Sequence, residues 1–372
     1  MPKHPGSIAL FAGMFFSAAL LAAAGGASAA TLSVGAGQKY KTIQAAIDAA
    51  TQGDVIAISP GSYTGARVYK SSLTLYGTAG GVTISGGLVQ SKGLIVVSSS
   101  NTTIKNITFS GAKGGDGNGA GIRMQGTNLT VLNSVFKNNQ NGILADPNGG
   151  STLTVKNSSF IHNGACVSSK GCAHGIYAGH IKLLDVENNT FTDTQSGHAI
   201  KSRAIATRVI GNTIKDGPTG TSSYLIDVPN GGAVTITGNK LEKGAKSSNA
   251  MTAIALGEEG NTNPAGVMLI ANNSFQNDHP KTQSFVWNST GNKALQVAGN
   301  VLSGYKTTPL KGSGIISGAP PVNTKLRSDL AFNMTRSSVM AVPESSSLAV
   351  FAGALVGLGI FAARRRRIKP AR

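Results

Sequence analysis

The chain has 372 residues and a formal net charge of +18 at pH 7, from 33 Lys and Arg against 15 Asp and Glu. The two terminal segments hold seven of the basic residues and one of the acidic residues, so the remainder stays near +12. This excess indicates a polyanionic partner such as an acidic polysaccharide or a membrane surface. Nucleic acid is not expected, because aromatic residues make up only 5% and no nucleic-acid-binding motif is present.

Residues 1–29 predict an export signal. Lys3 is followed by an apolar run over residues 8–24 and by a small-residue cleavage site, Ala27-Ser28-Ala29. The alternative, a membrane-spanning helix, needs about 20 apolar residues, and this run is shorter. We therefore expect the mature protein to be secreted and to act at the cell envelope.

The segment after the signal predicts a strand, a short helix and a second strand. Thr42 is a candidate N-cap, and the apolar residues behind it recur at helical spacing: Ile43, Ala46, Ile47 and Ala50. Residues 54–59 are expected to form a buried strand that ends at the Pro60-Gly61 turn. Residues 41–63 resemble the amino-terminal segment of pectin-lyase-like parallel β-helix proteins, including pectin esterases, in which this helix caps the first coil.

Short strands follow, without a convincing second helix. They are expected over residues 73–76, 82–85, 93–97 and 103–109. A phrase of Asn, one or two residues and a large apolar residue then recurs, and it ends at Phe109, Phe136, Phe160, Phe191, Ile214, Leu241, Phe275 and Leu302. These markers are 23 to 34 residues apart, which is typical of a solenoid.

The period alone does not separate the solenoid classes. Leucine-rich repeats share it, but their Leu-x-x-Leu-x-Leu phrases are missing, whereas β-branched strands, glycines and asparagines at turns favour a parallel β-helix. We predict an all-β fold over residues 30–320, a single-stranded right-handed parallel β-helix of about ten to twelve coils with a short N-terminal capping helix. The recurrent asparagines are expected to form structural ladders.

The repeat phrase stops at Pro320-Pro321, and residues 321–342 are expected to be a linker. Residues 343–372, together with Val342, contain a Val-Pro-Glu motif, an apolar run and a cluster of four arginines. This arrangement resembles the PEP-CTERM sorting signal of exported bacterial proteins, and it departs from that pattern at Ser345, where a second proline is usual. The alternative is an ordinary tail anchor. Both imply membrane association through the C-terminal segment, with the arginines inside.

Cys166 and Cys172 are the two cysteines of the chain, and they lie in one insertion. In an oxidising compartment we expect them to form a disulfide. A metal site made of the two cysteines with His162 and His174 is the alternative, and it is disfavoured because free thiolates do not persist there.

A second phrase aligns the coils, because an isoleucine recurs in each, and in all but one of these coils a Gly or Ala precedes it. The isoleucines predicted to stack in the core are Ile122, Ile143, Ile176, Ile200, Ile226 and Ile254. Side chains alternate along a strand, so the next residues stack on the outer face: Arg123, Leu144, Tyr177, Lys201, Asp227 and Ala255. Polar groups therefore concentrate on three neighbouring coils.

These polar groups suit β-elimination from a uronate, which needs a base, a cation that neutralises the carboxylate and an acid for the leaving oxygen. Lys201, Arg203 and Tyr177 provide all three types, and Lys201-Ser-Arg203 is similar to the basic pairs of β-helix lyases. Desolvation and Arg203 are expected to lower the pKa of Lys201, as a base requires. The predicted catalytic residues are Lys201, Arg203, Tyr177, His198 and Asp227, and the predicted substrate-binding residues are His174, Arg123 and Asp146.

Simpler interpretations stay open. Lys201 and Asp227 could form a surface salt bridge, which contributes about 0 to 1 kcal/mol. His174 and His198 could bond only the turn backbone. No metal or cofactor is predicted, because calcium would need an acidic cluster and the aspartates identified here are apart.

Glycoside hydrolysis is the second catalytic hypothesis. It needs two carboxyl groups about 5 to 9.5 Å apart. Asp146 and Asp227 are three coils apart, roughly 14 Å at 4.8 Å per coil, so Glu258 or Glu259, one coil beyond Asp227, is the closer partner. An esterase is not supported, since the Asp-Phe-Ile-Phe-Gly segment of pectin esterases is missing. The leading hypothesis is a protein that binds an acidic polysaccharide and cleaves it by β-elimination, and the remaining alternative is a non-catalytic surface or matrix protein.

Overall fold

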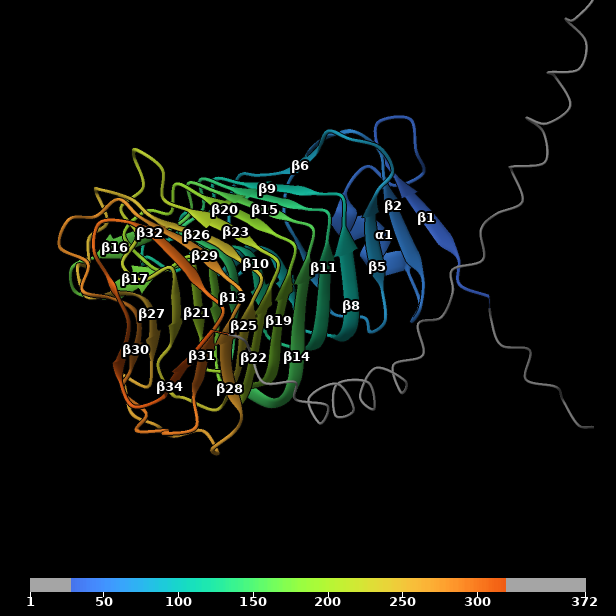
Figure 1. Ribbon diagram of the computed structural model, residues 1–372. Helices are drawn as coiled ribbons and strands as arrows, with labels where there is room; N and C mark the ends of the chain where they lie inside the picture. Colours follow the sequence, from blue (N-terminus) through green and yellow to red (C-terminus); the bar gives the residue numbers. More distant parts are fainter. Residues whose placement is uncertain (1–27, 319–372) are drawn as a thin grey trace, which may run out of the picture. The chain divides into compact units, whose positions relative to one another are not determined.

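The computed structural model describes residues 28–318, which form a right-handed parallel β-solenoid of about 10 turns (Figure 1). Each turn contributes one strand to each of three parallel sheets, so the predicted fold class is confirmed. The export signal (residues 1–27 of it), the linker and the sorting segment lie outside the described residues. Within residues 28–318, no helix is long and apolar enough to cross a membrane.

Most of the strands belong to three large sheets, A, B and C. Sheet A contains β1 (Thr31–Val34), β2 (Val55–Ile58), β5 (Thr74–Gly77), β8 (Ser100–Lys105), β11 (Thr127–Leu132), β14 (Asn148–Lys156), β19 (Ile181–Glu187), β22 (Ala206–Ile210), β25 (Ala233–Thr237), β28 (Met268–Ala271), β31 (Gln296–Ala298) and β34 (Ile315–Ser317). Sheet B contains β3 (Gly61–Tyr63), β6 (Val82–Ile84), β9 (Thr108–Ser110), β12 (Val135–Lys137), β15 (Ser159–Ile161), β20 (Thr190–Thr192), β23 (Thr213–Lys215), β26 (Lys240–Lys243), β29 (Ser274–Asn277) and β32 (Val301–Gly304). Sheet C contains β4 (Ala66–Val68), β7 (Gly93–Val97), β10 (Ala120–Met124), β13 (Asn141–Ala145), β18 (Ile176–Ala178), β21 (Ile200–Ser202), β24 (Ile226–Val228), β27 (Thr252–Leu256), β30 (Ser284–Asn288) and β33 (Thr308–Gly312).

Helix α1 (Ile43–Ala49) lies at the amino-terminal end of the solenoid (Figure 1). Thr42 is its N-cap, and the Thr42 hydroxyl accepts a hydrogen bond from the Ala45 amide at 3.1 Å. Its apolar face buries Ile43, Ala46 and Ile47 against the first strands. The predicted capping helix is therefore confirmed, and it covers core that an open end coil would expose.

Stacked apolar side chains fill the interior. The isoleucines expected to align do so, strand by strand, from Ile122 to Ile254 in sheet C. In sheet B, the rings of Phe109, Phe136, Phe160 and Phe191 stack with centroids 4.5 to 5.0 Å apart. Identical neighbours one coil apart thus fix the register of the whole solenoid.

The asparagines of the repeat phrase fall into two structural classes, although ladders were predicted for all of them. Five of them form a ladder in which the first four, which are buried, each donate to the side-chain oxygen of the next: Asn189, Asn212, Asn239, Asn273 and the half-buried Asn300. Asn106, Asn133 and Asn157 instead adopt positive φ angles of 60°, 49° and 52° at turns. Asparagine tolerates this left-handed conformation better than most residues, so both classes have a structural role.

Candidate functional site

The candidate site lies on the outer face of sheet C, where three strands place their middle residues side by side. Tyr177 on β18 pairs in register with Lys201 on β21, and Lys201 pairs with Asp227 on β24. The neighbouring isoleucines, Ile200 and Ile226, belong to the core. The alignment expected from the sequence is therefore confirmed, and all three polar side chains leave the outer face.

Outward-facing does not mean exposed at this site. Lys201 is only 8% exposed and Asp227 is fully buried. The loop of residues 257–263, which follows β27, is fastened beside them, because the Glu259 amide donates to the Pro229 carbonyl and Asn263 Nδ2 donates to the Ala204 carbonyl. The expected salt bridge between Lys201 and Asp227 exists at 3.0 Å, but it is buried, whereas a surface pair was predicted.

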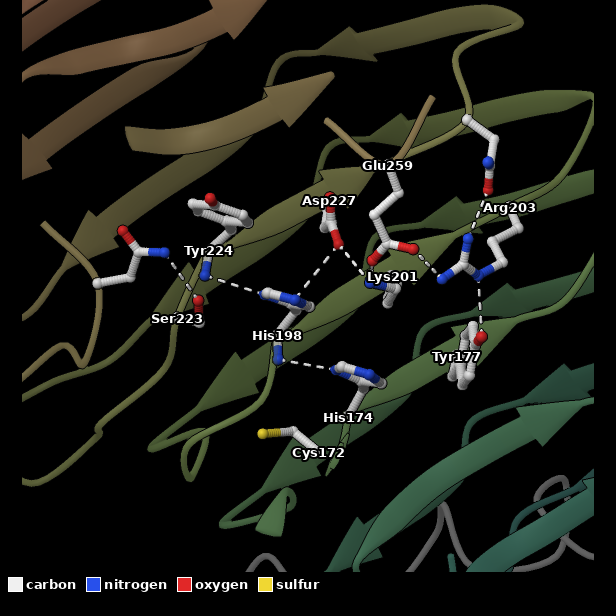
Figure 2. Close-up of polar contacts among 12 residues, drawn as sticks. Cys172, His174, Tyr177, His198, Lys201, Arg203, Ser223, Tyr224, Asp227 and Glu259 are labelled. Atoms are coloured by element: carbon white, nitrogen blue, oxygen red, sulfur yellow. Dashed lines mark hydrogen bonds and ion pairs between the residues drawn. The ribbon is translucent and has the colours of Figure 1, made fainter. Parts of the chain in front are cut away.

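The Glu259 carboxylate bridges the two cations (Figure 2). Lys201 Nζ donates to Oε1 at 2.5 Å, and an Arg203 Nη donates to Oε2. Burial would raise the pKa of Glu259, but the two cations outweigh it and the pKa is lowered. Glu259 is therefore an ionised carboxylate at neutral pH.

Arg203 is fixed from the side opposite Glu259. Its Nε donates to the Tyr177 hydroxyl oxygen at 2.9 Å, and its Nη1 donates to Asn230 Oδ1 at 2.7 Å. Burial opposes the charged guanidinium, but these hydrogen bonds and Glu259 leave its pKa above the usual value. Tyr177 and Asn230 thus hold a permanent cation in one orientation beside Glu259.

Lys201 does not have the lowered pKa that was predicted for it. Burial lowers the pKa, but the carboxylates of Asp227 and Glu259 raise it by more, so the net pKa lies above that of a free lysine. Asp227 sits 3.0 Å away and Glu259 2.5 Å away. The predicted direction of the pKa shift is therefore wrong, since the sequence did not show both carboxylates converging on Lys201, and its catalytic role stays a prediction.

Glu258 has the most unusual acid–base property of the site. Burial, followed by contact with Asp227, raises its pKa to about 9. Glu258 Oε2 and Asp227 Oδ1 are buried without a hydrogen bond from any donor, so a proton on Glu258 satisfies the contact between the two carboxyl groups. At neutral pH the site thus holds one carboxylic acid against one carboxylate.

His174 and His198 form a stacked ladder with Tyr224 (Figure 2). The ring centroids are 4.9 and 5.1 Å apart, and each histidine Nδ1 accepts a backbone amide of the next coil, from His198 and from Tyr224, at 3.0 Å. Because Nδ1 is an acceptor, Nε2 of His198 carries the proton and faces Asp227 Oδ2 at 3.3 Å.

The burial of this ladder affects both histidines for which a functional role is predicted. It lowers the pKa of His198 to about 4 and that of His174 well below its usual value, so both rings are neutral at neutral pH. His174 is only 5% exposed and stacks on His198, so its contacts are those of a buried ladder, and its role in substrate binding stays a prediction. His198 positions Asp227, and the simpler interpretation, bonding of turn backbone, holds for both Nδ1 atoms.

Arg123 and Asp146 bind each other. Arg123 Nη2 lies 2.5 Å from Asp146 Oδ1, and Gln125 donates to the same carboxylate at 3.0 Å. Arg123 is on β10, and β13 and β18 separate that strand from β21. The predicted substrate-binding pair is therefore a separate ion pair, further along the same sheet.

The predicted disulfide between Cys166 and Cys172 is confirmed. It joins the antiparallel strands β16 (Ala165–Val167) and β17 (Gly171–Ala173), which form a hairpin on the solenoid. His162 contacts Asp193 at 2.6 Å, and His174 belongs to the stacked ladder, so the alternative metal site is not formed. A polar hollow of about 620 Å³ beside the hairpin is lined by residues that include Lys113, His162 and Gln195.

An acidic cluster exists after all, although none was expected. Carboxylate oxygens of Asp227, Glu258 and Glu259 lie within 4.8 Å of one another. The Lys201 ammonium contacts two of these carboxylates and so supplies the positive charge that a metal ion would bring. The donor set suits calcium in type, but its charge is already compensated.

A second ion cluster, on the outer face of sheet A, provides a comparison. Lys156 and Arg208 contact Glu187 at 2.8 and 2.6 Å and Asp185 at 3.6 and 3.2 Å. Two cations thus balance two carboxylates. The sheet C cluster differs because it has a third carboxyl group and because that group keeps a proton.

The loop of residues 257–263 is the part of the site that the repeat pattern does not predict. The repeat pattern indicates Glu258 or Glu259 only as a closer partner for Asp227, and it gives no signal for Asn230. A usable signal was present: two acidic residues in a basic chain lie between Gly257 and Gly260 directly after an aligned strand. Both glycines have positive φ, 75° and 100°, which turns the loop back toward β24.

A known protein family supports the fold described above. A family model described as a right handed beta helix region matches residues 47–173. The chain has a right-handed β-helix fold. No curated protein matches it in sequence. Two solved structures are similar at low identity: a pectin methylesterase mutant with a hexasaccharide (14% identity, 66% of this chain and 79% of that chain, TM-score 0.33) and a pectin methylesterase with another hexasaccharide (16%, 69% and 80%, 0.31).

Proposed function

We propose that this β-helix protein binds an acidic polysaccharide on the outer face of sheet C and cleaves it by hydrolysis. The observation that carries the proposal is the contact of Glu258 with Asp227, which also pairs with Lys201, in surroundings that raise the pKa of Glu258 to about 9. Paired carboxyl groups whose environments separate their protonation states are the usual arrangement for acid–base cleavage of a glycosidic bond.

Recognition of the polymer is assigned to the two cations. A sugar carboxylate can pair with Arg203, which Tyr177 and Asn230 hold in one orientation, and with Lys201. The positive charge of the chain attracts a polyanion over a longer range. Neutral glycans would lack both interactions.

Glu258 is the proposed acid that protonates the leaving oxygen. Asp227 is the proposed second carboxylate, and His198 Nε2 and Lys201 stabilise its negative charge. Their oxygens lie within 4.8 Å of one another, well inside the spacing of inverting enzymes.

β-Elimination is the less favoured chemistry. It needs a neutral base near the sugar, and Lys201 is held as an ammonium by two carboxylates. Tyr177 accepts a hydrogen bond from Arg203, so it is committed to orienting that residue.

The test is to incubate the purified protein with pectate, alginate and glycosaminoglycans and to follow new reducing ends together with the ultraviolet absorbance of unsaturated uronates. We expect reducing ends without unsaturated products, and their loss in Glu258→Gln. The control Lys182→Ala, which removes an exposed cation from sheet A, should retain the activity. Unsaturated products would indicate elimination, and binding without any product would favour a non-catalytic surface protein.

The proposal also includes the cellular location of the protein, which rests on residues 1–29 and 343–372. The predicted export signal and the PEP-CTERM-like segment favour a protein exported to the cell envelope and held at the membrane by its C-terminal segment. Cell fractionation of the full chain and of a chain ending at residue 342 tests this. The proposal requires the first in the envelope fraction and the second in the soluble exported fraction.

A further inference from the structure

We propose that the Glu259 carboxylate occupies, in the free protein, the site that binds the carboxylate of an acidic sugar, and that the glycan displaces it. The inference rests on the proposed polysaccharide binding and does not require cleavage. It makes Glu259 an internal competitor that sets both affinity and the requirement for an anionic sugar.

The contacts of Glu259 are those of a bound ligand carboxylate. Its two oxygens are divided between two cations, Oε1 on Lys201 Nζ and Oε2 on an Arg203 Nη. Charge-assisted pairing of this kind is how proteins recognise a free carboxylate. The receptor groups are fixed independently of Glu259, since Asp227 holds Lys201 while Tyr177 and Asn230 hold Arg203.

Glu259 is also the member of the cluster that can leave. Its side chain is 40% exposed, against 9% for Lys201 and none for Asp227. The loop backbone is tied down through the Glu259 amide and Asn263, so rotation of the side chain suffices and Glu258 keeps its place. Water can solvate the released carboxylate, which a buried group would not permit.

Displacement has a definite thermodynamic consequence. A ligand that binds only the open form has its apparent affinity reduced by the fraction of protein in that form. Glu259 makes two partly exposed ion pairs, and each contributes modestly to holding its side chain in place. Removing this competitor should therefore strengthen glycan binding by about tenfold. A neutral sugar has no carboxylate to pair with Lys201 and Arg203, so its affinity should not increase.

The experiment is calorimetric titration with a purified oligogalacturonate, using wild type, Glu259→Gln and Glu259→Asp at one fixed ionic strength. Glu259→Asp keeps the negative charge but is too short to bridge both cations, so it separates occupancy from net charge. The matched control Asp48→Asn removes one exposed negative charge in helix α1. Thermal melting of each variant confirms that it is folded.

We expect about tenfold tighter binding for Glu259→Gln, a smaller gain for Glu259→Asp, and wild-type affinity for Asp48→Asn. The corresponding neutral oligosaccharide should show no gain. Wild-type binding that Arg203→Gln weakens, with no gain in either Glu259 variant, overturns the inference and leaves the proposed function standing. Absence of binding in wild type and in both Glu259 variants overturns the proposed function as well.

Discussion

Lys201 and Asp227 lie in register on neighbouring strands, with Lys201 Nζ 3.0 Å from Asp227 Oδ2, on the outer face of a sheet and yet almost inaccessible to water. The loop after β27 explains this combination, because it brings Glu258 and Glu259 over the pair. A buried ion pair needs nearly complete hydrogen bonding to offset its desolvation. The charges around Asp227 therefore form one interdependent group.

The first prediction concerns loss of one member of this group. Asp227→Asn should lower the free energy of unfolding by about 3 kcal/mol, because Lys201 then stays buried with Glu259 as its remaining carboxylate. Denaturant unfolding measures the change. Adding Lys201→Met to Asp227→Asn should recover part of the loss, and strictly additive effects would contradict the coupling.

Glu258 predicts a pH dependence in the neutral range. Its pKa is about 9 in the folded protein and near 4.5 when unfolded, so the unfolded state releases a proton first as pH rises. The contribution of Glu258 to stability is fully present below about pH 4.5 and is lost progressively toward pH 9. Unfolding curves of wild type and Glu258→Gln should diverge over that interval, with the variant losing less stability. Parallel pH profiles would show that Glu258 ionises normally.

Lys243 predicts the opposite slope at higher pH. It is fully buried, and its Nζ donates to the Ser223 carbonyl at 2.6 Å and to Ser247 Oγ at 2.8 Å. Burial lowers its pKa to about 8, only partly offset by Asp216. The protonated form thus costs stability below pH 8, about 3 kcal/mol for the shift, and this cost disappears as pH rises from about 8 to 10.5.

Lys243→Met tests this prediction. The difference in unfolding free energy between wild type and variant should change over the pH interval from about 8 to 10.5 and be constant below it. Lys182→Met, an exposed lysine on sheet A, is the matched control and should leave the pH profile of wild type unchanged. A constant difference across the whole interval would mean that Lys243 titrates like a free lysine.

The two classes of asparagine should respond differently to substitution. Asn239→Ala removes an acceptor for Asn212 and a donor to the Val209 carbonyl and to Asn273, and should cost about 2 kcal/mol of unfolding free energy. Asn133→Gly should be nearly neutral, since glycine suits its φ of 49°. Equal losses from both, measured by thermal or chemical unfolding, would contradict the distinction.

The fold could be predicted from sequence because its signals are local and repeated. Each coil contains one isoleucine and one large apolar residue at matching positions, and stacking requires only that like residues meet, as Phe136 and Phe160 do. The same periodicity correctly aligned Tyr177, Lys201 and Asp227. Periodicity does not describe loops between coils, however, and the identity of the site depends on one such loop.

The chemistry of the site was predicted less well for that reason. The pKa of Lys201 depends on the net effect of burial and two carboxylates, one of which, Glu259, is 58 residues away in sequence. His174 and His198 were placed correctly on neighbouring coils, but their burial and stacking decide that they are neutral. These properties follow from three-dimensional packing rather than from the repeat.

A crystal structure of the protein soaked with an oligogalacturonate would show directly whether a sugar carboxylate takes the place of Glu259. We expect one sugar carboxylate between Lys201 Nζ and the Arg203 guanidinium. The Glu259 side chain should then turn to solvent, and Glu258 should stay against Asp227. An oligosaccharide bound elsewhere, such as the hollow beside Lys113 and His162, with Glu259 still bridging both cations, would contradict this expectation.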